Sequence, residues 1–267
     1  MRIRWFWSIS VALVLAIALV LTGCGGGGGG QAGGGGGGDE QITVASDIAY
    51  PPFEFEKKGK PVGFDIDLMR EIGKRAGFTP EFQNVTFDGI IPGLGNNLYD
   101  AGASAFTITE AREKKVDFSD PYFNADQSLM VQSGSPIKSV EDIGDGTVGV
   151  QLGTTGELKA KEFEEQGKIT GEVRTYDTIT EAFSALENGQ IDAVMNDFPV
   201  SAYFAETGGG SLEVVQTIPT GEQYGIAFPQ DSDLLEPTNK ALEEIKKDGT
   251  YAKIYEKWIG KKPEEIP

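Results

Sequence analysis

Short apolar segments and amphipathic helical segments alternate along residues 41–260, which predicts an α/β fold with mostly parallel sheets. Ile42 to Val44 has the alternating faces of a strand. Phe64 begins a segment with an apolar side chain at every fourth position, and Gly77 ends it as a C′ glycine ends a helix. A second buried strand is predicted over 101–106. Further alternating segments lie at 129–132, 140–143, 147–150 and 156–166.

The clearest predicted helix covers residues 178–188. Thr178 and Glu181 have the spacing of a capping box, and Gly189 ends the segment. Its apolar positions are Ile179, Ala182, Phe183 and Leu186. A strand over 191–195 and a helix with Pro199 at N1 are expected next. Two C-terminal helices are indicated by the apolar positions Leu242, Ile245, Tyr251, Ile254, Tyr255 and Trp258.

The N-terminal segment is typical of an exported protein. Two arginines precede an almost entirely apolar run from Trp5 to Leu21, as in a secretory signal peptide. The following Leu21-Thr22-Gly23-Cys24 resembles the bacterial lipobox, which implies cleavage after residue 23 and a diacylglyceryl group on Cys24. The apolar run is also close to the length of a transmembrane anchor. A buried core helix fits less well, because no polar face interrupts the run.

Residues 24–40 are interpreted as the lipidated cysteine and a glycine-rich tether. Residues 25–38 are glycine apart from Gln31 and Ala32, so a flexible coil spanning roughly 20 Å is expected.

Composition excludes several classes of function. The formal charge is −18 over 267 residues and becomes −20 without Arg2 and Arg4. An acidic surface repels nucleic acid and anionic lipid. The chain contains no histidine and a single cysteine, which excludes histidine-based nucleophile systems and histidine or multi-cysteine metal sites. We expect no metal, no cofactor and no enzymatic activity.

Three segments carry candidate binding chemistry just after predicted strands, where open α/β sheets bind ligands. In the first, residues 104–112, Arg112 could grip a carboxylate through two parallel hydrogen bonds, with Thr107 as a further donor. The alternative is a surface arginine near Glu113 or Asp117. The second segment, residues 151–156, could present backbone amides at a helix N-terminus to an anion. It could equally be an ordinary strand-to-helix turn.

The third segment is Asn196-Asp197, before the Pro199 helix. Asp197 could accept from an ammonium group or simply cap the helix. Asp47 and Tyr50 lie in a proline-stiffened loop after the first strand, and Phe87 could add another aromatic wall, although such aromatics are more often core residues. Together these groups match a zwitterionic α-amino acid.

Residues 40–260 resemble the family-3 solute-binding proteins of polar amino-acid ABC transporters. The resemblance rests on the combination of four segments: 62–68 (VGFDIDL), 106–112 (FTITEAR), 116–122 (VDFSDPY) and 223–229 (QYGIAFP). It implies a two-lobed periplasmic-binding-protein-like fold of type II, with the ligand between the lobes. Lobe 1 would be 41–121 plus 225–267 and lobe 2 would be 128–219. The crossings would be 122–127 and 220–224.

The resemblance also implies roles for twelve residues. Arg112, Thr107 and the amide of Thr155, beside Thr154, would hold the ligand carboxylate. Asp197 and the Ala105 carbonyl would accept the ammonium group. Tyr50 and Phe87 would enclose the ligand side chain, and Asp47, Ser104, Gln151 and Asn196 would face its tip. Because no Lys or Arg is among these tip residues, glutamine, arginine, lysine or histidine is expected and glutamate or aspartate is not.

The implied protein is an extracytoplasmic, lipid-anchored monomer, on the periplasmic side or the cell surface. It would deliver its ligand to the permease and ATPase subunits of an importer by lobe closure. One rival is a cyclohexadienyl dehydratase-like enzyme on the same fold. Another is an amino-acid sensor domain of a receptor or a lytic enzyme. The sequence ends at Pro267, so we expect no kinase or muramidase domain to follow.

Overall fold

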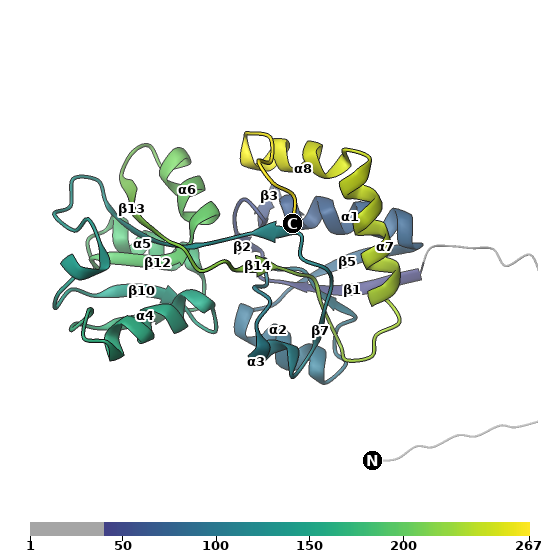
Figure 1. The fold of residues 1–267 in the computed structure, drawn as a ribbon, viewed down its shortest axis with the longest axis horizontal. Helices are drawn as coiled ribbons and strands as arrows, with labels where there is room; N and C mark the ends of the chain where they lie inside the picture. Colours follow the sequence, from purple (N-terminus) through teal and green to yellow (C-terminus); the bar gives the residue numbers. More distant parts are fainter. Residues whose placement is uncertain (1–39) are drawn as a thin grey trace, which may run out of the picture. The chain divides into compact units, whose positions relative to one another are not determined.

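The computed structural model describes residues 40–267, which contain two five-stranded sheets (Figure 1). The predictions about the signal peptide, Cys24 and the glycine-rich tether lie outside these residues. The strand order of the first sheet is β5-β1-β6-β15-β7 and that of the second is β11-β10-β12-β9-β13. The first sheet contains β1 Glu40–Ser46, β5 Phe78–Asn84, β6 Ala101–Gly102, β7 Asp117–Phe118 and β15 Ala227–Phe228. The second contains β9 Gln127–Gln132, β10 Val148–Gln151, β11 Val173–Tyr176, β12 Ala193–Asp197 and β13 Leu212–Ile218.

Helices cover both faces of each sheet (Figure 1). In the first sheet, α1, α7 and α8 pack on one face, and α2 and α3 lie on the other. In the second sheet, α4 lies opposite α5 and α6. The helices are α1 Phe64–Ala76, α2 Phe87–Gly95, α3 Glu110–Glu113, α4 Thr155–Glu165, α5 Ile179–Glu187, α6 Phe198–Thr207, α7 Leu235–Lys247 and α8 Thr250–Ile259, with a 3-10 turn η1 at Val140–Asp142. Within residues 40–267, no helix combines the length and apolarity that crossing a membrane requires.

Two short antiparallel strands, β8 Phe123–Asn124 and β14 Gln223–Tyr224, run side by side between the two sheets (Figure 1). An aromatic cluster holds them to the first sheet's side. The Phe53 ring lies edge-on to Phe123 and Tyr224, with centroids 4.8 and 5.2 Å away. A small sheet contains β2 Ala49–Tyr50, β3 Glu54–Lys57 and β4 Lys60–Val62. Phe53 lies between β2 and β3 and immediately precedes β3. We propose that each large sheet is the core of one lobe with the boundaries given above, and that β8 and β14 lie in the hinge.

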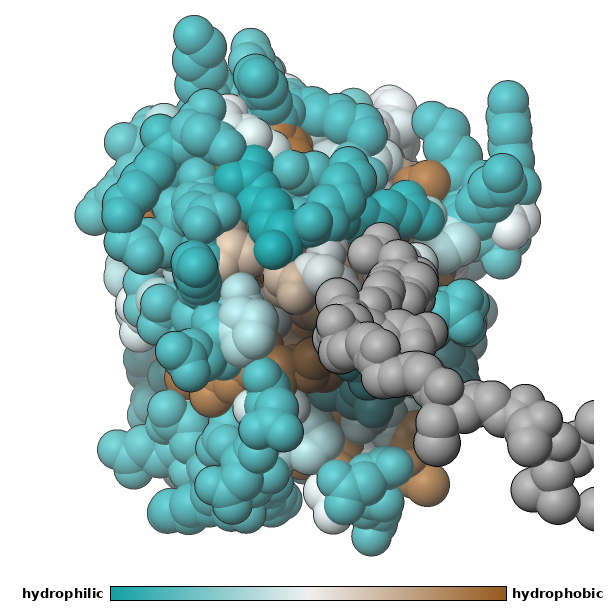
Figure 2. Space-filling view, turned by 90° about the vertical axis from the view of Figure 1, so that its right-hand side faces the viewer, coloured by the Kyte–Doolittle hydropathy of each residue, from teal (hydrophilic) through white to brown (hydrophobic). Residues whose placement is uncertain are grey.

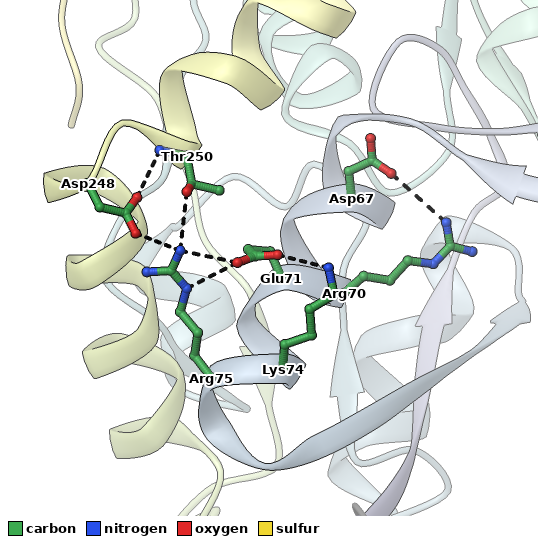
Figure 3. A network of polar contacts seen from close by, with 7 residues as sticks. All are labelled: Asp67, Arg70, Glu71, Lys74, Arg75, Asp248 and Thr250. Carbon is green, nitrogen blue, oxygen red and sulfur yellow. Dashed lines mark hydrogen bonds and ion pairs between the residues drawn. The ribbon is translucent and has the colours of Figure 1, made fainter.

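A polar network fixes α1 to the junction of α7 and α8 (Figure 3). Arg75 on α1 contacts Glu71 one turn earlier, and its Nη2 lies 2.8 Å from Asp248 Oδ2 and 3.2 Å from Thr250 Oγ1. The end of lobe 1 that carries these helices is covered mostly by polar side chains, with apolar side chains visible in recesses between them (Figure 2).

The expectation of mostly parallel sheets is wrong, because both sheets are mixed. In each, two neighbouring pairs are parallel and two are antiparallel. One strand in each sheet, β15 or β9, runs opposite to the others, and each of these follows a predicted crossing. No helix connects such a strand to its neighbour in the way that a parallel pair requires, so it is free to run antiparallel.

Two predicted strand boundaries are also wrong. Only Ala101–Gly102 of the predicted strand 101–106 is a strand, although Ala103 to Phe106 remain buried. The apolar run there reflects burial, and the left-handed φ of 45° at Ala105 prevents an extended strand from running through to Phe106. The strand expected over 191–195 is β12, Ala193–Asp197. It extends past Met195 because Asn196 and Asp197 remain paired with β9.

The capping box predicted for α5 is confirmed. Thr178 Oγ1 accepts from the Glu181 amide at 3.3 Å, and Glu181 Oε2 accepts from the Thr178 amide at 3.3 Å. Thr178→Ala should lower the free energy of unfolding by about 1 kcal/mol, because the first-turn amide loses its acceptor. Urea denaturation measures this change. Ser184→Ala, at an exposed position of the same helix, is the matched control and should be near neutral; an equal loss in both variants would contradict the capping role.

Candidate functional site

The carboxyl ends of four strands from the two sheets meet in one cleft. Asp47 and Ser104 follow β1 and β6 of the first sheet, while Gln151 and Asp197 end β10 and β12 of the second. Hydrogen bonds join the two sides directly. Gln151 Nε2 donates to Asp47 Oδ2, and the Tyr50 hydroxyl lies within hydrogen-bonding distance of two acceptors, Asn196 Oδ1 at 3.0 Å and Asp197 Oδ2 at 2.9 Å.

A small cavity at this junction is lined by nine of the twelve predicted ligand-binding residues: Tyr50, Phe87, Ser104, Ala105, Thr107, Arg112, Thr154, Thr155 and Asp197. The other three, Asp47, Gln151 and Asn196, are buried beside it and bonded across the cleft. The structure therefore brings all twelve together, and their individual roles stay predictions. A larger groove of about 600 Å³ lies between α6 and α8 beside the hinge, but it contains none of the twelve.

Arg112 is buried within this cleft although it lies on the one-turn helix α3. Its side chain sits over the rings of Phe87 and Phe106, with its Cζ atom 5.2 and 5.5 Å from their centroids. Nη1 donates to Thr107 O at 2.7 Å, and Nη2 donates to Gly153 O at 3.0 Å in the second sheet's lobe. Within residues 40–267, Arg112 has no ion-pair partner. The alternative of a surface arginine near Glu113 or Asp117 does not fit this burial.

The guanidinium retains binding capacity. It has five N–H groups, and backbone carbonyls take only two of them. Burial lowers the pKa of Arg112, whereas the charges of Asp197 and Glu222 raise it. The cation is therefore desolvated and held in place, with donors left for a planar anion such as a carboxylate.

Helix α4 points its N-terminus at the same space. Thr154 is its N-cap and accepts from the Glu157 amide at 3.1 Å. Thr155 Oγ1 lies 3.4 Å from Thr107 Oγ1 across the cleft. The first amides of a helix have no intrahelical acceptor, so binding of an anion by the Thr155 amide stays a prediction that this position allows. The 151–156 segment is thus both a strand-to-helix turn and a cleft wall.

Asp197 occupies the N-cap position of α6, but its side chain makes no capping bond. Pro199 is the second residue of this helix rather than the first. The carboxylate instead accepts from the hydroxyls of Tyr50 and Tyr224 and from Gln127 Nε2. Burial raises the pKa of Asp197, and these three hydrogen bonds and the Arg112 charge lower it. A carboxylate has about four acceptor sites, so one remains for an ammonium group.

Asp47 and Gln151 form the other end of the cleft. Gln151 Nε2 also donates to Asp177 O at 3.1 Å, so both its amide hydrogens are used. Burial raises the pKa of Asp47 to about 6, the Gln151 hydrogen bond lowers it, and the charges of Asp88 and Glu181 raise it. A cationic or amide ligand tip would complement this end.

Three polar residues of the site were not predicted: Gln127, Glu222 and Tyr224. Gln127 Nε2 lies 3.2 Å from Thr155 Oγ1 and 2.8 Å from Glu222 Oε2, which also accepts from Thr155 Oγ1 at 3.1 Å. Burial raises the pKa of Glu222. All three lie within the predicted crossings. Because the crossings border the cleft, this position was the one signal in the sequence that their side chains could face it.

Comparison with known proteins places this geometry in a family. The model of bacterial extracellular solute-binding proteins, family 3, matches residues 42–261. The chain belongs to this family. A probable histidine-binding protein of Neisseria gonorrhoeae is 34% identical over 82% of this chain and 82% of its own length. A glutamine-binding protein of an ABC transporter of Bacillus subtilis is 38% identical over 78% of this chain and 76% of its own.

A solved structure of an ancestral arginine-binding protein bound to arginine has a TM-score of 0.77 and 46% identity to this solute-binding protein. The match covers 82% of this chain and 97% of the ancestral one. The expected two-lobed fold is therefore confirmed, and so is the family that the four sequence segments indicated.

Tyr224→Phe tests the electrostatics around Asp197. The change removes one donor from a buried carboxylate and should lower the free energy of unfolding by about 1.5–3 kcal/mol at pH 8. The loss should shrink as the pH falls and Asp197 becomes protonated, because a neutral carboxyl gains less from that donor. Chemical denaturation at several pH values measures it.

Tyr203→Phe is the matched control, since among residues 40–267 the Tyr203 hydroxyl makes no side-chain hydrogen bond and the substitution should cost little. A Tyr224→Phe loss that does not vary with pH would contradict the assigned ionisation of Asp197.

Proposed function

We propose that this solute-binding protein captures a polar α-amino acid between its lobes and delivers it to an ABC importer. The observation that supports this best is the shared burial of Arg112 and Asp197 in one cavity without an ion pair between them. Arg112 keeps three N–H groups for the ligand carboxylate, together with the Thr155 amide. Asp197 keeps an acceptor site for the ammonium group.

The far end of the cleft favours glutamine, arginine, lysine or histidine. Asp47 and Gln151 supply carboxylate and amide groups there, and no lysine or arginine lies among the residues assigned to this end. A ligand with a second carboxylate would bring an uncompensated charge beside Asp47. Relatives that bind histidine, glutamine and arginine are consistent with this group of ligands.

Lobe closure supplies the signal to the importer. The Tyr50 hydroxyl bonds to Asn196 and Asp197, and Arg112 bonds to Gly153, so groups of one lobe contact groups of the other at the ligand position. A ligand that contacts both lobes stabilises the closed form by its differential affinity. The permease and ATPase subunits would then respond to the closed form.

The protein acts outside the cytoplasmic membrane, on the periplasmic side or at the cell surface. We propose that it is a monomer anchored by a diacylglyceryl group on Cys24, whose two chains are what stable anchoring needs. We also propose that it has no enzymatic activity, since the cleft offers no general acid beyond Asp47; turnover of prephenate or arogenate by the purified protein would contradict this.

A thermal-shift screen of the twenty amino acids tests the ligand assignment. The ligand should raise the melting temperature clearly above all other amino acids, because binding stabilises by RT ln(1 + [L]/Kd). In Arg112→Ala the shift should disappear, with affinity reduced at least ~100-fold (about 3 kcal/mol), since the ligand carboxylate is left unpaired.

Arg70→Ala, which removes an exposed arginine over the Phe82 ring, is the control and should keep the full shift. Near-normal affinity in Arg112→Ala would overturn the site assignment. Glutamate binding more tightly than glutamine, arginine, lysine and histidine would overturn the argument about the ligand tip.

The ratio of arginine to glutamine affinity should depend on pH through Asp47. An arginine side chain needs the ionised carboxylate, so arginine affinity should fall as the pH drops through about 6, by up to roughly tenfold per unit. Glutamine affinity should fall less, because its amide does not need the charge. The protonation of Asp197 affects both ligands through their ammonium groups and cancels in the ratio.

Isothermal titration from pH 8 to pH 5 measures this ratio. In Asp47→Asn the ratio should become independent of pH. A wild-type ratio that stays constant would contradict the placement of the ligand tip at Asp47.

A further inference from the structure

Two carboxyl side chains that the proposed binding mechanism does not use lie against each other in the first sheet's lobe. Glu54 is on β3 and Asp65 is in the first turn of α1, with exposed fractions of 0% and 2%. Gly63 brings the two elements together. It has φ of 139°, and a Cβ atom there would lie 2.0 Å from Phe53 O. The Asp65 amide donates to that same carbonyl at 2.9 Å.

Neither carboxyl group has a cationic partner among residues 40–267. The titratable groups that face the pair are acidic or neutral. Asp47 and Tyr50 lie toward Glu54, and Tyr122 and Tyr251 lie toward Asp65. Two adjacent buried carboxylates cannot both ionise under these conditions without a large electrostatic cost.

The hydrogen bonds show where a proton would lie. Glu54 Oε1 accepts from Ser104 Oγ at 3.0 Å, while Asp65 Oδ2 accepts from the Ala105 amide at 2.8 Å and the Tyr122 hydroxyl at 2.6 Å. The second oxygens, Glu54 Oε2 and Asp65 Oδ1, are buried and have no hydrogen-bond partner in residues 40–267, and each carboxyl group is close enough to the other to shift its pKa. A proton held between the two carboxyl groups would give these unpartnered oxygens a hydrogen bond.

Burial and the Asp65 charge raise the pKa of Glu54 well above its ordinary value. Burial raises the pKa of Asp65 to about 6, and the bonds from Tyr122, Ala105 and Glu54 lower it. Asp65, with two other donors, is thus the ionised member of the pair at neutral pH, and Glu54 is the protonated one.

The same pair supports the wall of the ligand cleft. Ser104 Oγ, which donates to Glu54, accepts from the Asp47 amide at 3.0 Å. The Ala105 amide, held by Asp65, belongs to a non-glycine residue with φ of 45°. Such a conformation persists only where surrounding contacts impose it. Asp47, Ser104 and Ala105 are all among the residues predicted to bind the ligand.

We propose that Glu54 and Asp65 share one proton and act as positioning residues for the Asp47 and Ser104–Ala105 walls of the ligand cleft. This inference rests on the proposed amino-acid site for its functional part, whereas the shared proton stands on the buried pair alone. Losing the proton would place two charges in a dry space and displace Ser104 and Ala105, which would weaken binding.

Infrared difference spectroscopy of the full chain tests the proton. At pH 8, where exposed carboxyls are ionised, the wild type should show the C=O band of a protonated carboxylic acid, and this band should be absent in Glu54→Gln. If the wild type lacks the band, or Glu54→Gln retains it unchanged, the shared proton is overturned. This measurement does not depend on the ligand, so it separates failure of the pair from failure of the proposed function.

Titration with glutamine and arginine tests the positioning role. Glu54→Leu keeps the volume but removes both hydrogen bonds, and its affinity should fall at least tenfold. Glu54→Gln retains an acceptor for Ser104 and a donor for Asp65, so it should bind at least tenfold more tightly than Glu54→Leu. Equal affinity in the two folded variants would overturn the positioning role. If Glu54→Leu fails to fold, the pH dependence of affinity tests the role instead. Wild-type affinity should fall at alkaline pH as the pair loses its proton, whereas Glu54→Gln has no such proton to lose and should keep its affinity. An alkaline fall that is the same in both proteins would overturn the role.

Discussion

The cleft holds a guanidinium and a carboxylate in one desolvated space without joining them in an ion pair. Arg112 is bonded to backbone carbonyls of both lobes, and Asp197 is bonded to two tyrosine hydroxyls and a glutamine amide. Each charge is fixed but keeps unused hydrogen-bonding capacity. In the function proposed above, a zwitterionic α-amino acid would supply the missing partner to both groups, which an anion or a cation alone would not.

The rest of the fold serves to bring these two groups together and keep them dry. Parallel β1–β6 and β10–β12 pairs aim their carboxyl ends at the same cleft, and the aromatic rings of Phe87 and Phe106 lie against the buried Arg112 guanidinium. Polar residues of the crossings, Gln127, Glu222 and Tyr224, connect Asp197 to the N-terminus of α4. The predicted crossings therefore contribute polar side chains to the wall of the cleft. The Glu54–Asp65 pair shares one feature with Asp197. These buried carboxyl groups are stabilised by hydrogen-bond donors rather than by a cationic side chain.

Features set by neighbouring residues could be predicted from the sequence. The Thr178–Glu181 capping box and the Gly77 helix end depend on contacts within one turn, so their patterns predicted them correctly. The position of Arg112 after an apolar segment predicted its place at a sheet edge, although its burial against two rings could not be inferred. Features set by distant partners were missed. The extent of β12 depends on its pairing with β9, the backbone of Ala105 depends on Asp65, and the roles of Gln127 and Glu222 depend on how the hinge faces the cleft. No local pattern distinguishes such polar residues from solvent-exposed ones.

Calorimetry with ligand analogues tests the central claim most directly. Once the preferred amino acid is known, its binding is compared with that of the analogue without the α-carboxylate and the analogue without the α-ammonium group. Each analogue should lose at least ~100-fold in affinity (about 3 kcal/mol), because each leaves one buried charge, Arg112 or Asp197, without its partner. An analogue that binds within a few-fold of the parent amino acid would contradict the claim that both charges hold the ligand.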